Sequence, residues 1–516
     1  MKGKMKAYLL LQALLAYCMC PVSSLDVLLV SAPFPGHANC LLAIGEELVV
    51  RGHNVTFSSL DNWVNLRHKS TERGMRYLSA GKQAVTQAEW NNIISKRASL
   101  QGFFSKNPLA IIEELRLLDQ SRPLSGIDEI AKYFMNINLQ QWDIIVTEHY
   151  LTHRIPCIAK SRNVTVVMTS MTYFSNESPP WPFPSYESAY SDNLGFKERG
   201  FIVIMFFINR FFALANSFRT SFDKFSCKET FKYPVELGWE VPYIITTVLG
   251  LEYPRTISPL TTYVGPVLSQ ALLNQHLLPV DLNDWLRNKN NKSVIYISMG
   301  SQLSLSDKMA QEIINGISDT DYHVIWSVGD INKDIILSID SSRYYTSSWI
   351  PQLTLLQHSS ISMAILHGGS NGIHESLYFG IPIIVIPGMG DQFDWAVRVS
   401  DAGVGLQLLR HEVTSRGLRD SIRRIDNDGY HKRAEKMSVL MKRGGGIKRA
   451  AELVEFYGTY GYDHLIPGPI KYKWNWIQYY NVDVHIVLLV GLVAIVMILK
   501  RSCKCCTSKK TKIKQI

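Results

Sequence analysis

Residues 26–58 read DVLLVSAPFPGHANCLLAIGEELVVRGHNVTFS, and this stretch decides the fold class. Residues 26–30 form a nearly continuous apolar run, which is typical of a parallel strand buried on both faces. The pattern then predicts a loop over residues 32–37, a helix over 41–50 that Gly52 ends, and a second strand over 54–58. This order predicts the start of a doubly wound parallel sheet.

A second series of strand and helix patterns begins at residue 293. Two such series predict an α/β protein with two Rossmann-like halves that face a cleft, and the link between them is expected within residues 266–284, where both patterns lapse. Strands are predicted over 143–147 and 164–169 in the first series and over 294–298, 323–327, 363–366 and 383–386 in the second, with helices over 306–316 and 375–380.

The two ends of the chain carry targeting signals. Residues 1–24 combine a basic start with an apolar core and small residues at the cleavage positions, so we expect a signal peptide. Residues 482–499 are apolar and follow an aromatic segment, which predicts a transmembrane helix. The basic tail, residues 500–516, is then cytosolic by the positive-inside rule, and the rest of the chain is lumenal. The lysines of this tail at the third and fifth positions from the C-terminus resemble a retrieval signal for the endoplasmic reticulum. We therefore expect a single-pass type I protein of that membrane.

Composition and charge exclude several classes of protein. Charged residues make up 19% and hydrophobic residues 46% of the 516 residues, which excludes a disordered chain and indicates more than one domain. The formal charge is +10, but residues 1–24 and 500–516 hold all of that excess. The body between them is formally neutral, so the charge gives no reason to expect a nucleic acid partner.

Cysteines and glycosylation motifs fit a secretory route. Between the signal peptide and the membrane helix lie Cys40, Cys157 and Cys227, which allow at most one intramolecular disulfide, and the pairing stays open. Glycosylation is predicted at Asn163, Asn176 and Asn291.

Residues 349–392 hold most of the candidate functional residues. LHGGSNGIHE, residues 366–375, predicts a strand that leads through a glycine-rich turn into a helix near residue 371. Such a turn lets a diphosphate approach the backbone, and the helix N-terminus offers unpaired N–H groups. An indole can stack on a base, an amide can bond to it, and carboxylates can hold sugar hydroxyls. The predicted donor site consists of Trp349, Gln352, His367, Gly368, Gly369, Asn371, Gly372, Glu375, Asp391 and Gln392.

This segment resembles the signature of the UDP-glycosyltransferase family, especially the membrane-bound UDP-glucuronosyltransferases of animals, and the likeness extends over nearly the whole chain. The resemblance implies a GT-B fold, two Rossmann-like domains facing a cleft, with a C-terminal transmembrane helix. It also implies roles for the site: Trp349 and Gln352 bind uracil, His367 and Asn371 the diphosphate, Glu375 the ribose, and Asp391 and Gln392 the donor sugar, and Ser301 adds a phosphate contact.

His37 is the candidate catalytic base. It follows the first strand, at the sheet edge where ligands bind, and the family carries a Gly-His pair there. Histidine has a pKa near neutrality, which suits removal of a proton from an acceptor hydroxyl. A carboxylate must orient this imidazole. The family usually has an aspartate at the end of the strand near residue 147, and here the matching residue is Glu148, whose extra methylene changes the geometry.

The predicted layout has six parts, and their boundaries follow the patterns above. They are a signal peptide (1–24), an acceptor-binding Rossmann-like domain (25–268), a UDP-sugar-binding Rossmann-like domain (285–448), a C-terminal helix with a membrane-proximal segment (449–481), a transmembrane helix (482–499) and a basic cytosolic tail (500–516).

No metal ion and no cofactor besides the UDP-sugar co-substrate is expected. Two Asp-x-Asp strings occur, at 319–321 and 426–428, and both are expected at helix-to-strand turns, where aspartate is favoured. His367 and a helix N-terminus are expected to neutralise the phosphates instead.

The expected function is inverting transfer of a sugar, glucuronate first, from UDP-sugar to a small lipophilic acceptor. Two alternatives stay open: a glucosyl- or galactosyltransferase, and a catalytically weak protein that binds UDP-sugar or lipid and modulates partners. The exchange at Glu148 favours the latter, whereas the intact His37 and donor segment favour an enzyme. The expected partners are UDP-sugar, the acceptor and the endoplasmic reticulum membrane. Homo- and hetero-oligomers both stay open.

Overall fold

The computed structural model describes residues 24–100, 126–151, 154–172, 189–204, 241–255, 257–274, 277–300, 305–328, 335, 340–466, 476–479 and 481–512. Two parallel sheets dominate these residues, each built from one of the two predicted series. The predicted fold class is therefore confirmed.

The first sheet has seven strands in the order β3-β2-β1-β4-β5-β6-β7. The chain starts in the middle of this sheet at β1 and winds outward in both directions, so the carboxyl ends of β1 and β4 lie side by side. The strands are β1 (Asp26–Val30), β2 (Asn54–Asp61), β3 (Arg76–Lys82), β4 (Ile144–Glu148), β5 (Thr165–Ser170), β6 (Tyr243–Ile245) and β7 (Thr261–Tyr263).

The second sheet has six strands in the order β10-β9-β8-β11-β12-β13. Its central pair is β8 and β11, and the glycine-rich segment follows the carboxyl end of β11. The strands are β8 (Val294–Ser298), β9 (His323–Ser327), β10 (Tyr344–Ser347), β11 (Ile361–Leu366), β12 (Ile383–Val385) and β13 (Gly405–Gln407).

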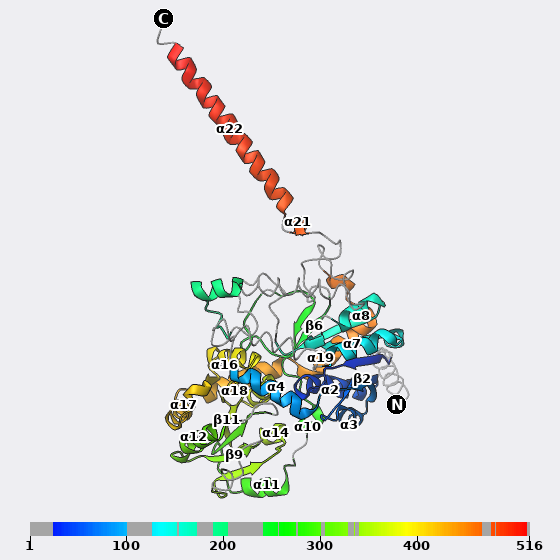
Figure 1. Cartoon of the computed structure of the whole chain (residues 1–516), viewed down its shortest axis with the longest axis vertical. Coiled ribbons are helices and arrows are strands. Elements are labelled where there is room, and N and C mark those ends of the chain that lie inside the picture. Colours follow the sequence, from blue (N-terminus) through cyan, green and yellow to red (C-terminus); the bar gives the residue numbers. More distant parts are fainter. Residues whose placement is uncertain are drawn as a thin grey trace, which may run out of the picture.

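Helices connect the strands and flank both sheets (Figure 1). They are α2 (Pro35–Val50), α3 (Leu66–Thr71), α4 (Gln87–Leu100), α7 (Ile127–Asn136), α8 (Ile155–Ser161), α10 (Gln270–Leu273), α11 (Val280–Leu286), α12 (Asp307–Ser318), α14 (Gln352–Leu355), α15 (Ser370–Tyr378), α16 (Asp391–Asp401), α17 (Ser415–Asn427), α18 (Tyr430–Arg443), α19 (Gly446–Tyr460), α21 (Trp476–Tyr479) and α22 (Val482–Lys512), with 3-10 turns η2 (Leu139–Gln141), η3 (His149–Leu151), η7 (Arg410–Glu412) and η8 (Asp463–Leu465).

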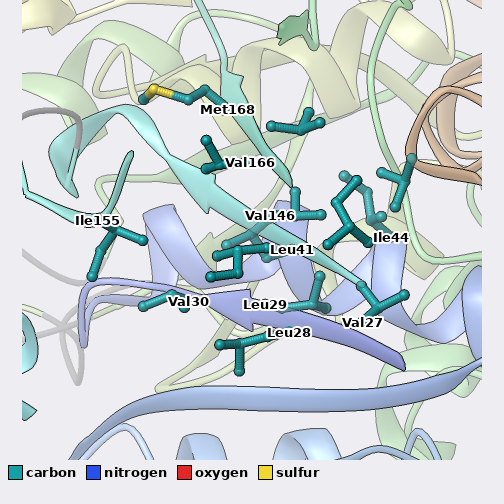
Figure 2. Packing of buried hydrophobic residues seen from close by; sticks show 14 of the residues in the cluster. Val27, Leu28, Leu29, Val30, Leu41, Ile44, Val146, Ile155, Val166 and Met168 are labelled. Atoms are coloured by element: carbon teal, nitrogen blue, oxygen red, sulfur yellow. The ribbon is translucent and has the colours of Figure 1, made fainter. Parts of the chain in front are cut away.

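The core of the first sheet forms where α2 packs on β1 and β4. Figure 2 shows Leu41 and Ile44 of α2 beside Val146 of β4 and the side chains of β1. Leu41, Ile44 and Val146 have no solvent-exposed surface. Burial of one such side chain contributes about 1.5–3 kcal/mol, so this packing fixes the start of α2, where His37 lies, against the sheet.

Helix α19 returns from the second half of the chain to the first sheet. Its buried residues, among them Val454 and Tyr457, belong to the same hydrophobic cluster as β1 and β4. Glu455 of this helix accepts hydrogen bonds from Arg51 (2.9 Å) and His53 (2.8 Å), which lie at the end of α2. His53 is thus a buried structural residue.

Helix α22 extends away from the two sheets (Figure 1). Within it, Val482–Arg501 has a mean hydropathy of 2.8 and none of it is buried, so it is long and apolar enough to cross a membrane. No other helix among the described residues meets these criteria of length and apolarity.

Two local predictions are wrong, and a third is right in its place in the chain but not in its local structure. Helix α2 begins at Pro35, so residues 35–37 are helical rather than part of a loop, because proline fits the first turn of a helix. The segment 266–284 lies between β7 and β8, as expected of the link, but it contains α10 and the start of α11, whose Leu282 packs into the second sheet's core. The string at 426–428 covers the last two residues of α17 and its C-cap, just before α18, so it lies at a helix-to-helix turn.

The described cysteines and glycosylation motifs have distinct environments. Cys157 is disulfide-bonded, whereas Cys40 is buried and free. Burial raises the pKa of the Cys40 thiol to about 12, which leaves it unreactive. Asn163 and Asn291 are both exposed in turns, and Asn176 lies outside the described residues.

Candidate functional site

The structure brings His37 and Glu148 together at the carboxyl edge of the first sheet. His37 lies in the first turn of α2, and Glu148 is the last residue of β4. Because β1 and β4 are parallel neighbours, the ends of these strands meet at one edge. His37 Nδ1 lies 3.1 Å from Glu148 Oε2. Glutamate at this position therefore reaches the imidazole despite its extra methylene.

Two features hold this carboxylate in place. Glu148 is only 3% exposed, and its Oε1 accepts a hydrogen bond from the Ala32 amide at 3.3 Å. The other acid near this strand, Asp143, lies at the opposite end and accepts a hydrogen bond from the Asp26 amide at 2.8 Å. Asp143 is therefore structural, and Glu148 orients the histidine.

The environment of His37 suits a base. Burial alone would lower the pKa of His37, but the adjacent Glu148 carboxylate and, more weakly, Asp391 outweigh burial, so the pKa lies above its ordinary value. Donation of Nδ1–H to Glu148 leaves Nε2 as the proton acceptor.

His149, which the sequence analysis missed, is a third member of this group. Its Nδ1 lies 3.8 Å from Glu148 Oε2, and its ring centroid lies 5.6 Å from that of His37. Burial lowers the pKa of His149 to about 4, so the ring is neutral at pH 7. Its position directly after the expected acid is the signal that could have identified it.

An apolar cluster lies next to His37. Phe34 stacks on Trp90 with ring centroids 4.5 Å apart, and Ala32 and Val85 complete the buried cluster. The Phe34 ring is 6.0 Å from the His37 ring. Met389, from the second half of the chain, packs against the same cluster. A hydrophobic molecule bound here would lie beside the imidazole.

Glycines frame His367 at the end of β11. A Cβ added to Gly300 would come within 2.5 Å of the His367 ring, and one added to Gly369 would come within 2.4 Å of Nε2. Gly368 adopts a φ of +91°, which favours glycine, and a Cβ there would approach the Gln392 carbonyl at 2.9 Å. A Cβ on Gly372 would make only ordinary contacts of 3.4 Å and longer.

The charge expected on His367 is absent. Burial lowers the pKa of His367 to about 4, so the ring is neutral near pH 7. A neutral imidazole can still donate one hydrogen bond to a phosphate oxygen. The positive end of α15, which starts at Ser370, supplies positive potential at this turn.

Gln352 and Glu375, which are expected to bind the base and the ribose, form a hydrogen-bonded chain with Tyr296. Tyr296 Oη donates to Gln352 Oε1 at 2.9 Å, and Gln352 Nε2 donates to Glu375 Oε2 at 2.6 Å. Burial raises the pKa of Glu375 to about 7, and the Gln352 bond opposes this only in part. Tyr296, in the middle of a buried strand, carried no sequence signal. Trp349 is 71% exposed, so its ring is open to a stacking partner.

Asn371 and Asp391 reach across to the first half of the chain. Asn371 Nδ2 donates to the Gly36 carbonyl at 3.4 Å, next to His37. Burial raises the pKa of Asp391, and the charge of His37 partly opposes this rise. Gln392 accepts hydrogen bonds from the Gly388 and Met389 amides through Oε1, so it also closes its own loop.

Two further predicted features remain, Ser301 and the Asp-x-Asp strings. Ser301 lies outside the described residues. The Asp-x-Asp strings have structural contacts instead: Asp319 pairs with Arg419, and Asp426 accepts a hydrogen bond from Tyr322 at 2.6 Å.

A buried ion cluster fixes α16, the helix that begins with Asp391. Glu252, which follows β6 of the first sheet, is 1% exposed and accepts a hydrogen bond from Arg398 of α16 at 3.0 Å. Arg255 approaches the same carboxylate at 3.3 Å, and Thr172 donates to it at 2.5 Å. This cluster ties the donor side of the site to the first sheet. No sequence pattern indicated it.

Known proteins with similar sequences are transferases. A family model described as "UDP-glucoronosyl and UDP-glucosyl transferase" matches residues 26–515. The chain is 26% identical over 506 residues to human UDP-glucuronosyltransferase 2B15, covering 90% of each chain. It is 27% identical over 344 residues to rat 2-hydroxyacylsphingosine 1-beta-galactosyltransferase, and that match covers 64% of this chain and 62% of the galactosyltransferase.

Solved structures confirm the fold. The glycotransferase of kitacinnamycin superposes with a TM-score of 0.59 at 19% identity, covering 84% of this chain and 99% of that one. Os79 from O. sativa, in complex with U2F and trichothecene, superposes with a TM-score of 0.60 at 16% identity, covering 84% and 100%. The family match over residues 26–515, the two parallel sheets and the similar solved structures together show that the chain belongs to the UDP-glycosyltransferase family with a GT-B fold.

Proposed function

We propose that the protein is an inverting glycosyltransferase that moves glucuronate from UDP-glucuronate to a hydroxyl of a small lipophilic acceptor. The observation that carries the proposal is the His37–Glu148 pair, at 3.1 Å, beside the Phe34–Trp90 cluster. The imidazole supplies a base, and the apolar cluster suits a lipophilic acceptor. Asn371, whose amide donates to the Gly36 carbonyl next to His37, would hold the diphosphate, and Asp391 would hold the donor sugar.

In the proposed reaction, His37 Nε2 takes the proton of the acceptor hydroxyl as its oxygen attacks the anomeric carbon. A new carbon–oxygen bond forms, the bond from that carbon to the β-phosphate oxygen breaks, and UDP leaves with the electron pair. Attack from the face opposite UDP converts an α-linked donor into a β-glycoside. Glu148 stabilises the imidazolium that forms. None of these steps calls for a metal ion or a further cofactor.

Galactose is the second candidate for the donor sugar. The observation that favours it is the 27% identity to rat 2-hydroxyacylsphingosine 1-beta-galactosyltransferase, which is as similar as the glucuronosyltransferases are. Membranes bearing the protein should be incubated with UDP-glucuronate, UDP-glucose and UDP-galactose and a panel of phenols and sterols, and products identified by mass. Product formed from UDP-glucuronate alone supports glucuronate as the donor sugar. Product formed from UDP-glucose or UDP-galactose would assign that sugar to the enzyme instead. No product from any donor would instead favour a UDP-sugar-binding modulator.

We also propose the setting in which this reaction occurs. The apolar segment Val482–Arg501 and the basic residues after it suit a single-pass type I protein of the endoplasmic reticulum with both sheets in the lumen. The exposed Asn163 and Asn291 would then be glycosylated. Treatment of sealed microsomes with a glycosidase tests both statements. The mass of the protein should fall only after detergent opens the microsomes, because the glycans would lie in the lumen.

Replacing Glu148 with glutamine should change the pH profile. The carboxylate raises the pKa of His37, so its removal leaves burial to lower that pKa. Because the base must be neutral, the acid limb of the kcat/KM profile should move to lower pH. Loss of a charged hydrogen-bond partner should also lower kcat by roughly 10- to 100-fold. An acid limb that stays in place would contradict the role of Glu148.

Binding of UDP should depend on the ionisation of Glu375. Its pKa of about 7 in the free protein would fall when ribose hydroxyls donate to the carboxylate, so UDP binding should release protons near pH 7. The affinity for UDP should therefore rise with pH, by up to roughly tenfold between pH 6 and pH 8. Calorimetry in buffers of different ionisation enthalpy measures the released protons. Glu375→Gln should abolish the pH dependence, and its persistence would exclude this ribose contact.

Gly369→Ala should weaken UDP binding by displacing His367. The added Cβ would lie 2.4 Å from Nε2, so the ring must move by about 1 Å, enough to break a phosphate hydrogen bond worth roughly tenfold in affinity. Gly372→Ala is the matched comparison on the same helix, because its Cβ makes only ordinary contacts. Calorimetric titration with UDP should give the larger loss for Gly369→Ala, and equal losses would contradict the steric explanation.

A further inference from the structure

One group of side chains at the site has more potential ligands than a base and its orienting acid require. His37, Glu148 and His149 each offer one ligand atom, and these three atoms all lie within 4.8 Å of one another. Two imidazoles and one carboxylate are a ligand set that zinc uses in sites with an open fourth position. We propose that His37, Glu148 and His149 bind a Zn²⁺ ion and that this ion switches the transferase off.

The distances suit a tetrahedral ion. With metal–ligand bonds near 2.0–2.1 Å, neighbouring ligands of such an ion lie about 3.3 Å apart. Glu148 Oε2 is 3.1 Å from His37 Nδ1 and 3.8 Å from His149 Nδ1, so the two observed distances bracket that value. All three ligand atoms lie within 4.8 Å of one another, so side-chain rotations need only draw the longest separation in to about 3.3 Å to close the site.

The three side chains come from rigid elements. His37 lies in the first turn of α2, Glu148 ends β4, and His149 begins the 3-10 turn η3. The second oxygen of Glu148 accepts a hydrogen bond from the Ala32 amide at 3.3 Å, which fixes the carboxylate in the way that outer-shell partners orient metal ligands. An ion can enter, because the side chains of His37 and His149 are 28% and 24% exposed.

The ligand set selects among common divalent ions. Mg²⁺ and Ca²⁺ prefer oxygen ligands in larger numbers, so two imidazoles disfavour both. Zinc accepts nitrogen and carboxylate oxygen at four positions, and a water would fill the fourth.

A zinc ion here would block the proposed reaction through a change of tautomer. In the free protein, Nδ1–H of His37 donates to Glu148, and Nε2 is left to accept a proton. With zinc on Nδ1, the neutral ring carries its proton on Nε2, and Glu148 ligates the ion instead of orienting the ring. The base is then lost without any covalent change. This consequence rests on the proposed role of His37, whereas zinc binding itself does not.

The test measures bound metal apart from catalysis. Full-length protein in detergent is dialysed against chelator-buffered Zn²⁺, and bound zinc per chain is counted for the wild type and for His149→Gln. Loss of a direct ligand should weaken zinc binding by at least the roughly 10- to 100-fold that outer-shell changes cost. UDP affinity, measured by calorimetry, shows whether the variant is folded, and His149→Asp, which keeps a ligand at this position, should regain zinc.

His68→Gln is the matched control. His68 pairs with Glu72 at 3.0 Å in an exposed i,i+4 pair that offers only two ligands. The expected result is one zinc ion per wild-type or His68→Gln chain and none per His149→Gln chain at the same free zinc. Equal zinc binding by all three proteins, or no binding by the wild type, would overturn the site. If zinc binds as expected but sugar transfer by the wild type does not fall with the same midpoint, the switch is wrong.

Discussion

Replacing His37 with alanine should lower kcat/KM for sugar transfer by roughly 10²- to 10⁴-fold, the contribution that a positioned general base usually makes. The loss corresponds to about 3–5 kcal/mol of transition-state stabilisation. The physical reason is the geometry: the pair with Glu148, at 3.1 Å, leaves Nε2 as an acceptor whose pKa lies above the ordinary histidine value. Alanine provides no proton acceptor, and water must take its place.

Two controls make this result specific. UDP affinity should change little in His37→Ala, because the ring contacts Glu148 and lies beside the acceptor side of the site. His68→Ala removes an exposed histidine and should retain full activity, since its side chain is 63% exposed and paired only with Glu72. Activity of His37→Ala within threefold of the wild type, with UDP affinity intact, would exclude His37 as the base.

Replacing Glu252 with glutamine should destabilise the protein by about 3–5 kcal/mol. Glu252 is 1% exposed and lies between two buried cations, Arg398 at 3.0 Å and Arg255 at 3.3 Å. Glutamine has nearly the same shape but no charge, so the positive charges would stay buried without this compensating carboxylate. Urea or thermal unfolding, followed by circular dichroism, measures the loss.

The control for Glu252→Gln is Glu452→Gln. Glu452 pairs with Arg449 at 3.1 Å on the surface, where each side chain is 50% exposed, and the loss should be at most about 1 kcal/mol. Because Arg398 lies on the helix that begins with Asp391, donor affinity should also fall in Glu252→Gln alone. Equal small losses of stability in both variants would contradict a structural role for the buried cluster.

The sequence predicts those parts of the fold that local patterns encode. The bounds of β1, β8 and β9 are as predicted, because each strand is an apolar run buried on both faces. The glycine turn before α15 can also be predicted from the sequence, because the positions beside His367 leave no room for a Cβ. Short helices such as α10, a four-residue element, lack the length over which a period can be recognised.

Only some residues of the candidate site could be predicted from the sequence. His37 and the donor residues could be named from spacing and family resemblance, and Glu148 from its place at a strand end. His149, Tyr296 and the Glu252–Arg398 pair could not be named, because their roles come from contacts between residues far apart in the chain. Glu252 and Arg398, for example, are 146 residues apart. The neutral state of His367 also depends on burial, which no motif expresses.

The decisive measurement is the anomeric configuration of the product, determined by NMR, together with the amount of UDP released, for the wild type and for His37→Ala. From an α-linked UDP-sugar, the wild type should form a β-glycoside and UDP in equal amounts, and His37→Ala should form almost none of either. An α-glycoside, or a β-glycoside formed equally well by His37→Ala, would contradict in-line attack assisted by His37.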